Sequence, residues 1–381
     1  MRHLAAKLAV FGAAAAVVLG TGVSSASASF SLKGAGSTLI QPMLANVWIP
    51  DFQSANSGDT VSYPGGGSTA GINDITANDV NFGASDAPMT SAQLSACGAN
   101  CKQIPWALSA TGPVYNISGV SSLNLSGPVL AGIYSGTITT WDDPAIKKIN
   151  PGVALPSATI AVFWRSDGSG DTFVFESFLA DTDSSYKSFL GTAGPTTTSN
   201  FPDKTGTGEK SNSGVATAVS NTPDSIGYVS TFYAHDAQLH GASVENASGK
   251  FVHPYPQDMT DAANLVPASA LSSSNYNTEP VIANYVAAKG YHAKKLKKGQ
   301  KAPKVSKAQK ALQTDELGAY PLSTFTDVLV RSDGPDVPDL QKFILFCLSP
   351  AEQSESKTGS QSFAPLPSAV VKFDTAQVNA L

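Results

Sequence analysis

The chain has 381 residues, of which 42% are hydrophobic and 14% are charged, and its formal net charge is −5. This length suggests two domains, and the acidic balance excludes a general electrostatic attraction to nucleic acid. An acidic chain that binds an anion must concentrate positive potential locally.

The first 28 residues are predicted to be a cleavable secretory signal peptide and not part of the fold. Arg2 and Lys7 precede an apolar run from Leu8 to Gly20, and Ala26-Ser-Ala28 matches a small-residue cleavage site. The apolar run is too short to span a membrane, and the alternative is a buried alanine-rich helix. No cysteine lies near the cleavage site to carry a lipid anchor. We therefore expect a secreted, extracellular or periplasmic protein.

The mature chain begins with strands that run through glycine turns into helices. Strands are predicted within 30–38, 60–63 and 80–84, and helix-like apolar spacing covers 39–53 and 70–77. Further strands are predicted at 159–164, 225–229 and 320–330, with helices at 172–179 and 340–348, the latter as the final helix. This alternation is typical of a mostly parallel α/β sheet.

The three cysteines allow one short-range disulfide. Cys97 and Cys101 flank a three-residue loop that could close a bridge after export, whereas Cys347 sits in an apolar run and is expected to be a buried free thiol. A zinc site would need more cysteine or histidine ligands nearby, and the sequence offers none. We expect no metal and no cofactor.

Residues 289–310 form a lysine-rich segment with nine lysines and no acidic residue. One interpretation is a solvated surface insertion. The other is a segment that attaches electrostatically to an anionic wall or membrane surface.

Four predicted strand ends carry residues that suit an anion: Gly36-Ser37-Thr38, Gly67-Ser68-Thr69, Ser85-Asp86, and Arg165 to Asp171. Ligands of open α/β sheets bind beyond the carboxyl ends of the strands. Three of these turns enter helices, whose first amides are unpaired and carry partial positive charge. Because serine and threonine are also ordinary helix caps, each turn alone is weak evidence.

Two charged side chains make the pattern more specific. The planar guanidinium of Arg165 suits an oxyanion, and Asp167 could orient it, although a surface ion pair is the alternative. Asp86 would repel an anion unless that anion carries a proton to donate, as phosphate does and sulfate does not. The alternative for Asp86 is a cap of the following segment.

Five motifs in this order resemble the phosphate-binding component of the Pst-type phosphate ABC transporter: Gly34-Ala-Gly-Ser-Thr38, Gly66-Gly-Ser68, Phe82-Gly-Ala-Ser-Asp-Ala-Pro88, Trp141-Asp-Asp143 and Arg165-Ser-Asp-Gly-Ser-Gly170. The similarity runs from about Ser31 to Val330. It implies a two-lobed periplasmic-binding-protein fold of the flytrap type II class, with α/β lobes and two crossing strands. Lobe one would be 29–111 plus 320–381, and lobe two 112–319 with the lysine-rich insertion.

The resemblance also implies a set of phosphate contacts and a partner. The matching residues are Thr38, the Leu39 amide, Ser68, Asp86, Arg165, Ser169 and the Gly170 amide, with Asp167 as the partner of the arginine. Asp171 stands where family members vary, so it either contacts the ligand or only favours the dipole of its helix. The partner would be the permease subunits of an ABC importer, served by a monomeric binding protein.

Two other functions are alternatives. A sulfate or molybdate binder would have no use for Asp86 as a proton acceptor. A secreted phosphatase would need a metal cluster or an activated nucleophile, but the histidines join no acidic cluster and Gly168-Ser169-Gly170 is not a nucleophile elbow. We expect a binding protein and no enzyme.

Overall fold

The computed structural model describes residues 29–199, 201, 206–266 and 318–381. The predicted signal peptide at 1–28 and the lysine-rich segment at 289–310 lie outside the described residues. Both therefore stay predictions.

The described strands form one nine-stranded sheet and one three-stranded sheet. Their bounds are β1 Ser31–Gly36, β2 Thr60–Ser62, β3 Phe82–Ser85, β4 Cys101–Asn116, β5 Asn124–Leu125, β6 Ala161–Arg165, β7 Thr207–Glu209, β8 Ser225–Ser230, β9 His240–Gly241, β10 Ser243–Glu245, β11 Phe251–Val252 and β12 Ser323–Arg331. The large sheet runs β2-β1-β3-β12-β4-β8-β6-β7, with β9 also paired to β4, and the small sheet runs β11-β10-β5. Parallel pairs β1–β2, β1–β3, β6–β7 and β6–β8 agree with the predicted α/β class. The large sheet is mixed and not mostly parallel as expected, because β4 and β12 pair antiparallel with all their neighbours in it.

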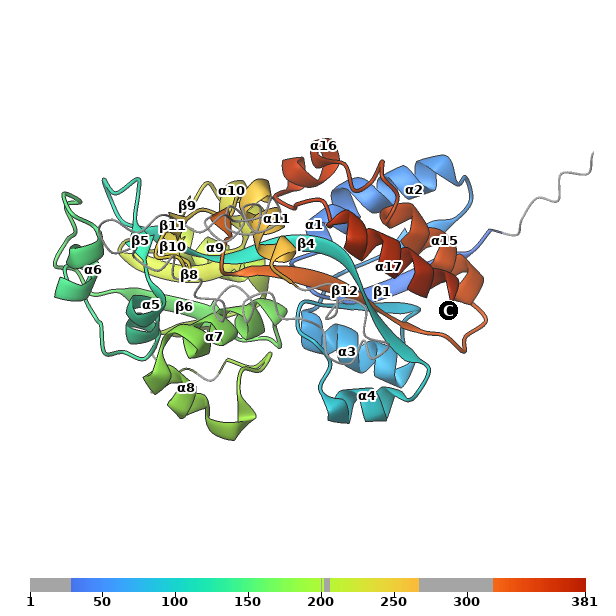
Figure 1. The fold of residues 1–381 in the computed structure, drawn as a ribbon, viewed down its shortest axis with the longest axis horizontal. Coiled ribbons are helices and arrows are strands. Elements are labelled where there is room, and N and C mark those ends of the chain that lie inside the picture. The colour runs from blue at the N-terminus through green and yellow to red at the C-terminus, as the bar shows by residue number, and fades with distance from the viewer. Residues whose placement is uncertain (1–28, 200, 202–205, 267–317) are drawn as a thin grey trace, which may run out of the picture.

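Strand β4 connects the two halves of the molecule. Its first part, up to Ala110, pairs antiparallel with β12, and its last part, from Thr111, pairs antiparallel with β8. Figure 1 shows β4 and β12 running between two lobes, as the flytrap architecture requires. Because the sheet continues through β4 without a break, the residue boundaries of the lobes stay a prediction.

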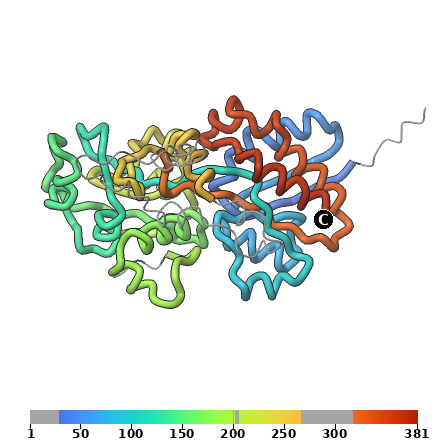
Figure 2. Tube along the Cα trace, in the orientation of Figure 1, coloured from blue at the N-terminus to red at the C-terminus, as the bar shows by residue number. Residues whose placement is uncertain are grey.

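The helices cover the faces of this sheet (Figures 1 and 2). Their bounds are α1 Gln41–Met43, α2 Ile49–Ala55, α3 Ser68–Ala77, α4 Ser91–Cys97, α5 Gly127–Tyr134, α6 Pro144–Ile149, α7 Gly170–Thr182, α8 Ser184–Leu190, α9 Ser211–Asn221, α10 Thr231–Asp236, α11 Pro256–Asn264, α15 Val337–Cys347, α16 Glu355–Thr358 and α17 Ser368–Asn379. The tube in Figure 2 shows that the blue N-terminal and red C-terminal segments build the same lobe.

The prediction of a final helix at 340–348 was wrong, because α16 and α17 follow α15. Helix α17 packs against α15 and against β4. Only scattered apolar positions such as Val370 and Val378 mark its buried side. Its stability therefore comes from packing against remote elements, which a local pattern does not reveal.

The helix predicted at 39–53 is present, but it contains a π-helical turn from Leu44 to Trp48 between α1 and α2. Pro50, at the start of α2, has no amide hydrogen to donate and its ring crowds the preceding turn. The wider π turn, in which the amide of Ile49 reaches the carbonyl of Leu44, accommodates the proline.

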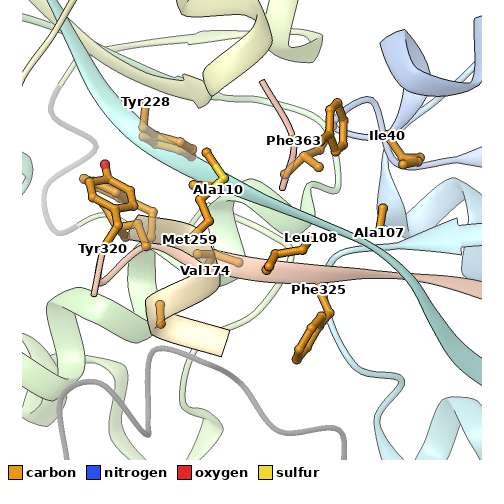
Figure 3. Close-up of a cluster of buried hydrophobic side chains, with 14 of the residues drawn as sticks. Ile40, Ala107, Leu108, Ala110, Val174, Tyr228, Met259, Tyr320, Phe325 and Phe363 are labelled. Carbon is orange, nitrogen blue, oxygen red and sulfur yellow. The ribbon is translucent and has the colours of Figure 1, made fainter. Parts of the chain in front are cut away.

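The hydrophobic core is continuous from one lobe to the other along β4 and β12. Figure 3 shows Leu108 and Ala110 on β4 and Phe325 on β12 among side chains from both sides, including Tyr228 and Val174. All five are buried. This shared core holds β4 and β12 in place. The strands and helices that pack beside them carry the predicted site.

The cysteines are arranged as the sequence suggested. Cys97 and Cys101 form a disulfide that joins the end of α4 to the start of β4. Cys347 is a buried free cysteine in α15.

Candidate functional site

The four turns singled out by the sequence meet between the two lobes. The Ser68 hydroxyl, at the start of α3, accepts a hydrogen bond of 3.0 Å from the backbone amide of Gly170, at the start of α7. The Thr69 amide donates to the carbonyl of Gly168 at 3.1 Å. The predicted side chains are at most 5% exposed: Thr38, Ser68, Asp86, Arg165, Ser169 and Asp171.

Glycine is required where the lobes touch. A Cβ atom on Gly170 would lie 2.6 Å from both the Cβ of Asp86 and the hydroxyl oxygen of Ser68. No ordinary side chain fits there, so the glycine allows the first turn of α7 to approach the opposite lobe. Ser169 caps this helix, because its hydroxyl accepts from the Thr172 amide at 3.4 Å.

Both backbone donors predicted for the site face serine hydroxyls. The Leu39 amide donates to the Ser37 hydroxyl at 3.0 Å, and the Gly170 amide donates to Ser68. These serine oxygens occupy positions that a phosphate oxygen could take, since both accept hydrogen bonds from helix-end amides. Both serine hydroxyls also reach the same oxygen of Asp86, so the amides of Leu39, before α1, and of Gly170, at the start of α7, point toward the same interlobe region.

Arg165 is the cation of the site and is held on two sides. Its Nε and one terminal nitrogen each donate to Asp167 at 2.7 Å, and the other terminal nitrogen donates to Asp171 at 2.8 Å. Burial alone would lower the pKa of Arg165, but the two carboxylates raise it above its ordinary value. Burial opposes the charge of Asp167, yet the arginine lowers the pKa of that carboxyl. The predicted Arg165–Asp167 pair is therefore present, with the arginine buried and the Asp167 side chain 11% exposed.

Asp86 lies opposite this ion pair and is surrounded by hydroxyl donors. One carboxyl oxygen accepts from Thr326 at 2.7 Å, and the other accepts from Ser37 at 2.5 Å and from Ser68 at 3.3 Å. Burial raises the pKa of Asp86 to about 7, and the negative charge of Asp171 adds to the rise, while the hydroxyls of Ser37 and Thr326 and the charge of Arg165 oppose it. This carboxyl can therefore hold or accept a proton near neutral pH.

Asp171 lies inside the site, although it also belongs to the first turn of α7. One of its oxygens accepts from the Thr111 hydroxyl at 2.5 Å, and the other from Arg165 at 2.8 Å and from the Asn212 amide at 2.7 Å. The side chain is thus more than a helix-dipole partner. Whether it also contacts a ligand stays a prediction.

Ser37 lies in a turn that the sequence indicated, but sequence reasoning missed three other residues that build the site: Thr111, Asn212 and Thr326. Thr111 and Thr326 lie within long strands, where no local pattern separates them from other strand residues. Asn212 follows Ser211, which has a positive φ of 66°, at the start of α9. The polar run Lys210-Ser-Asn-Ser-Gly214 was the one available signal, and it resembles an ordinary helix start.

Among the described residues, no three histidine, cysteine or acidic side chains gather as a metal would require. Within the same described residues, no helix is both long and apolar enough to cross a membrane.

Comparisons with known proteins identify the family of the chain. A family model described as a PBP superfamily domain matches residues 21–351. A phosphate-binding protein PstS of Xylella fastidiosa strain Temecula1 is 36% identical over 238 residues, or 62% of this chain, and the chain spans only 63% of that relative. A phosphate-binding protein PstS of Pasteurella multocida is 39% identical over 244 residues, covering 63% of this chain and 68% of the relative.

A solved structure shares the fold. It is a high-affinity periplasmic phosphate-binding protein, PfluDING, bound with phosphate, and it aligns with a TM-score of 0.65. The alignment covers 92% of this chain and 93% of that chain at 23% identity, so it bears on the fold alone.

Proposed function

The chain belongs to the PBP superfamily and, within it, to the family of the PstS relatives, and from this premise we propose that it is a secreted protein that binds inorganic phosphate for an ABC importer. The proposal includes cleavage of residues 1–28, a monomeric state and docking on permease subunits. Binding, and not catalysis, is its activity.

The observation that carries the proposal is Asp86 facing a donor-rich interlobe region. In its ionised form this buried carboxyl is a poor neighbour for an anion that has no proton to donate. It is a good neighbour for phosphate, which retains at least one proton near neutral pH and can donate it to the carboxylate. Asp86 therefore favours phosphate over sulfate.

The remaining contacts supply donors from both lobes. We assign the phosphate contacts to the hydroxyls of Thr38, Ser68 and Ser169, the amides of Leu39 and Gly170, and the guanidinium of Arg165. Asp167 orients the arginine through its two hydrogen bonds of 2.7 Å. Asp171 neutralises part of the charge of Arg165 and is a candidate contact of the phosphate.

Closure of the lobes follows from this division of ligands. An anion that touches Thr38 and Ser68 on one side and Arg165 on the other binds the closed arrangement better than an open one, and so favours it. Direct contacts between lobes, such as the 2.8 Å hydrogen bond between the hydroxyls of Thr69 and Thr197, add to the closed form. A closed, loaded protein is the form that an importer can recognise.

The test is calorimetric titration of the protein without residues 1–28 against phosphate, arsenate and sulfate. We expect tight binding of phosphate, binding of arsenate because it also carries protons, and weak or no binding of sulfate. Equal affinity for phosphate and sulfate would refute the role of Asp86, and hydrolysis of a phosphate ester by the pure protein would refute the assignment as a binding protein.

A further inference from the structure

The side-chain amide of Asn212 forms hydrogen bonds with three different segments of the chain. It is fully buried near the start of α9. Its Nδ2 donates to the Thr38 hydroxyl at 3.0 Å and to an oxygen of Asp171 at 2.7 Å. Its Oδ1 accepts from the Ser230 backbone amide at 2.8 Å. An asparagine has two donor hydrogens and one acceptor oxygen, and here all of them are engaged.

These contacts cross the boundary between the lobes. Thr38 follows β1, whereas Asp171 is in α7 and Ser230 ends β8, on the other side of β4 in the sheet order. The bond from Asn212 to Thr38 therefore joins the turn after β1 to the lobe that carries Arg165. It does so beside the candidate site and next to the carboxylate that pairs with Arg165.

The contact also restricts the direction of the Thr38 hydroxyl hydrogen. Because the Thr38 oxygen accepts from Asn212, its own hydrogen must point elsewhere. In the part of the chain that the structure describes, this oxygen takes part in no other hydrogen bond. The hydroxyl is thus prepared to donate, as an anion in the site requires.

We propose that Asn212 is a positioning residue for anion binding: it turns the Thr38 hydroxyl into a donor toward the ligand and holds Asp171 against Arg165 when the lobes close. The inference rests on the proposed phosphate-binding function. A neutral amide is needed at this position, because only it can donate twice and accept once in the same place.

A purely structural role is the alternative, since the first turn of α9 also donates from the Ser211 amide to Asp167 at 3.1 Å. The replacement Asn212→Asp separates the two roles. It keeps an oxygen for the Ser230 amide but removes both donor hydrogens. Asn116→Asp is the matched control, because the Asn116 amide donates at 3.0 Å to two carbonyls, of Val219 and Ser220, at the other end of α9.

Calorimetry with inorganic phosphate is the first measurement. We expect Asn212→Asp to bind phosphate about 10- to 100-fold more weakly than wild type at neutral pH, the effect of a lost hydrogen bond to a charged group. Asn116→Asp should bind phosphate as wild type does, even if both variants unfold at a lower temperature without ligand. Wild-type affinity in Asn212→Asp would overturn the inference, whereas a wild type that fails to bind phosphate would overturn the proposed function instead.

The pH dependence supplies a readout that a structural role would not move. The introduced carboxyl faces Asp171, with Arg165 and Asp167 beyond it, and regains one donor hydrogen when it is protonated. The ratio of Asn212→Asp to wild-type dissociation constants should therefore shrink as pH falls, while the ratio for Asn212→Ala should not. Taking ratios cancels the ionisation of phosphate itself, and the same ratio at every pH for Asn212→Asp would contradict the donor role.

A double-mutant cycle identifies the group through which Asn212 acts. If it acts partly through Thr38, the losses of phosphate affinity in Asn212→Asp and Thr38→Val should add up to more than the loss in the double variant. Strictly additive losses would mean that Asn212 does not orient the Thr38 hydroxyl.

Discussion

The tetrapeptide Arg-Ser-Asp-Gly occurs twice in this chain, and its two copies differ in burial and in their neighbours. Arg165 to Gly168 follows β6, and Arg331 to Gly334 follows β12. In both copies two nitrogens of the arginine donate hydrogen bonds to the aspartate two residues further on. These N–O distances are 2.7 Å in the first copy and 3.2 and 3.3 Å in the second. The local sequence therefore builds the same ion pair twice.

The surroundings decide what each pair does. The Arg165 side chain is 1% exposed and its third nitrogen meets the carboxylate of Asp171, whereas the Arg331 side chain is 26% exposed and meets the carbonyl of Cys97. Water screens the second pair, so it contributes little to stability. Burial makes the first pair costly to break. Because water screens the buried Arg165 charge less, that charge attracts an anion more strongly than the charge of Arg331 would.

The largest expected effect comes from removing the two arginines in turn. Arg165→Ala should weaken phosphate binding by about 2–5 kcal/mol, because it removes the counter-charge of a desolvated anion and leaves Asp167 and Asp171 unpaired. Arg331→Ala should leave the dissociation constant unchanged. Calorimetry gives the phosphate dissociation constants of both variants. Equal losses of affinity would mean that the buried and the exposed arginine do not differ in phosphate binding.

The next effect concerns the carboxyl opposite Arg165. Asp86→Asn should weaken phosphate binding by about 1.5–3 kcal/mol, because an amide cannot accept the phosphate proton as a carboxylate does. It should also narrow the preference for phosphate over sulfate, since the repulsion of sulfate is relieved. Titration of wild type and variant with both anions measures this preference, and an unchanged ratio of the two affinities would speak against Asp86 as the selecting group.

Much of this site was predictable from sequence because its parts are turns at strand ends. Glycine, serine and an Arg-x-Asp pair leave a local signature, so the residues around Ser68 and Arg165 were found. Thr111, Thr326 and Asn212 were missed because they reach the site only through the pairing of β4 with β12 and β8 and the packing of α9. The second Arg-Ser-Asp-Gly segment makes the same point, because nothing within its four residues says whether the pair will be buried.

A smaller effect should follow from the two aspartates of the repeated tetrapeptide. Asp167→Asn leaves Arg165 paired with Asp171, so we expect phosphate binding to weaken by about 1.5 kcal/mol, the low end for a charged hydrogen bond. Asp333→Asn, its surface counterpart, should have no effect on the dissociation constant. If the two variants bind phosphate equally well, Asp167 does not orient the arginine.

The smallest effect is a shift in pH dependence caused by Asp171. The pKa of Asp86 is raised from 3.8 to about 7, so the folded, ligand-free protein holds this proton more tightly than the unfolded chain does. The contribution of Asp86 to the free energy of unfolding should therefore be fully present below about pH 4 and should be lost as pH rises through about 7. Burial is the largest cause of the raised pKa, and the charge of Asp171 is the next.

Asp171→Asn should lower the pKa of Asp86 without returning it to its ordinary value. It removes the negative charge and leaves Arg165 less neutralised, and both changes favour the ionised form of Asp86. The loss of this contribution on raising the pH should then finish at a lower pH than in wild type. Asp86→Asn should remove the contribution of Asp86 and leave those of other carboxyls with a raised pKa, such as Asp258. Urea unfolding of the ligand-free proteins from about pH 4 to about pH 8 measures all three curves. Curves of the same shape for wild type and Asp171→Asn would mean that burial alone sets the pKa of Asp86, and that the two carboxyls do not act on each other across the site.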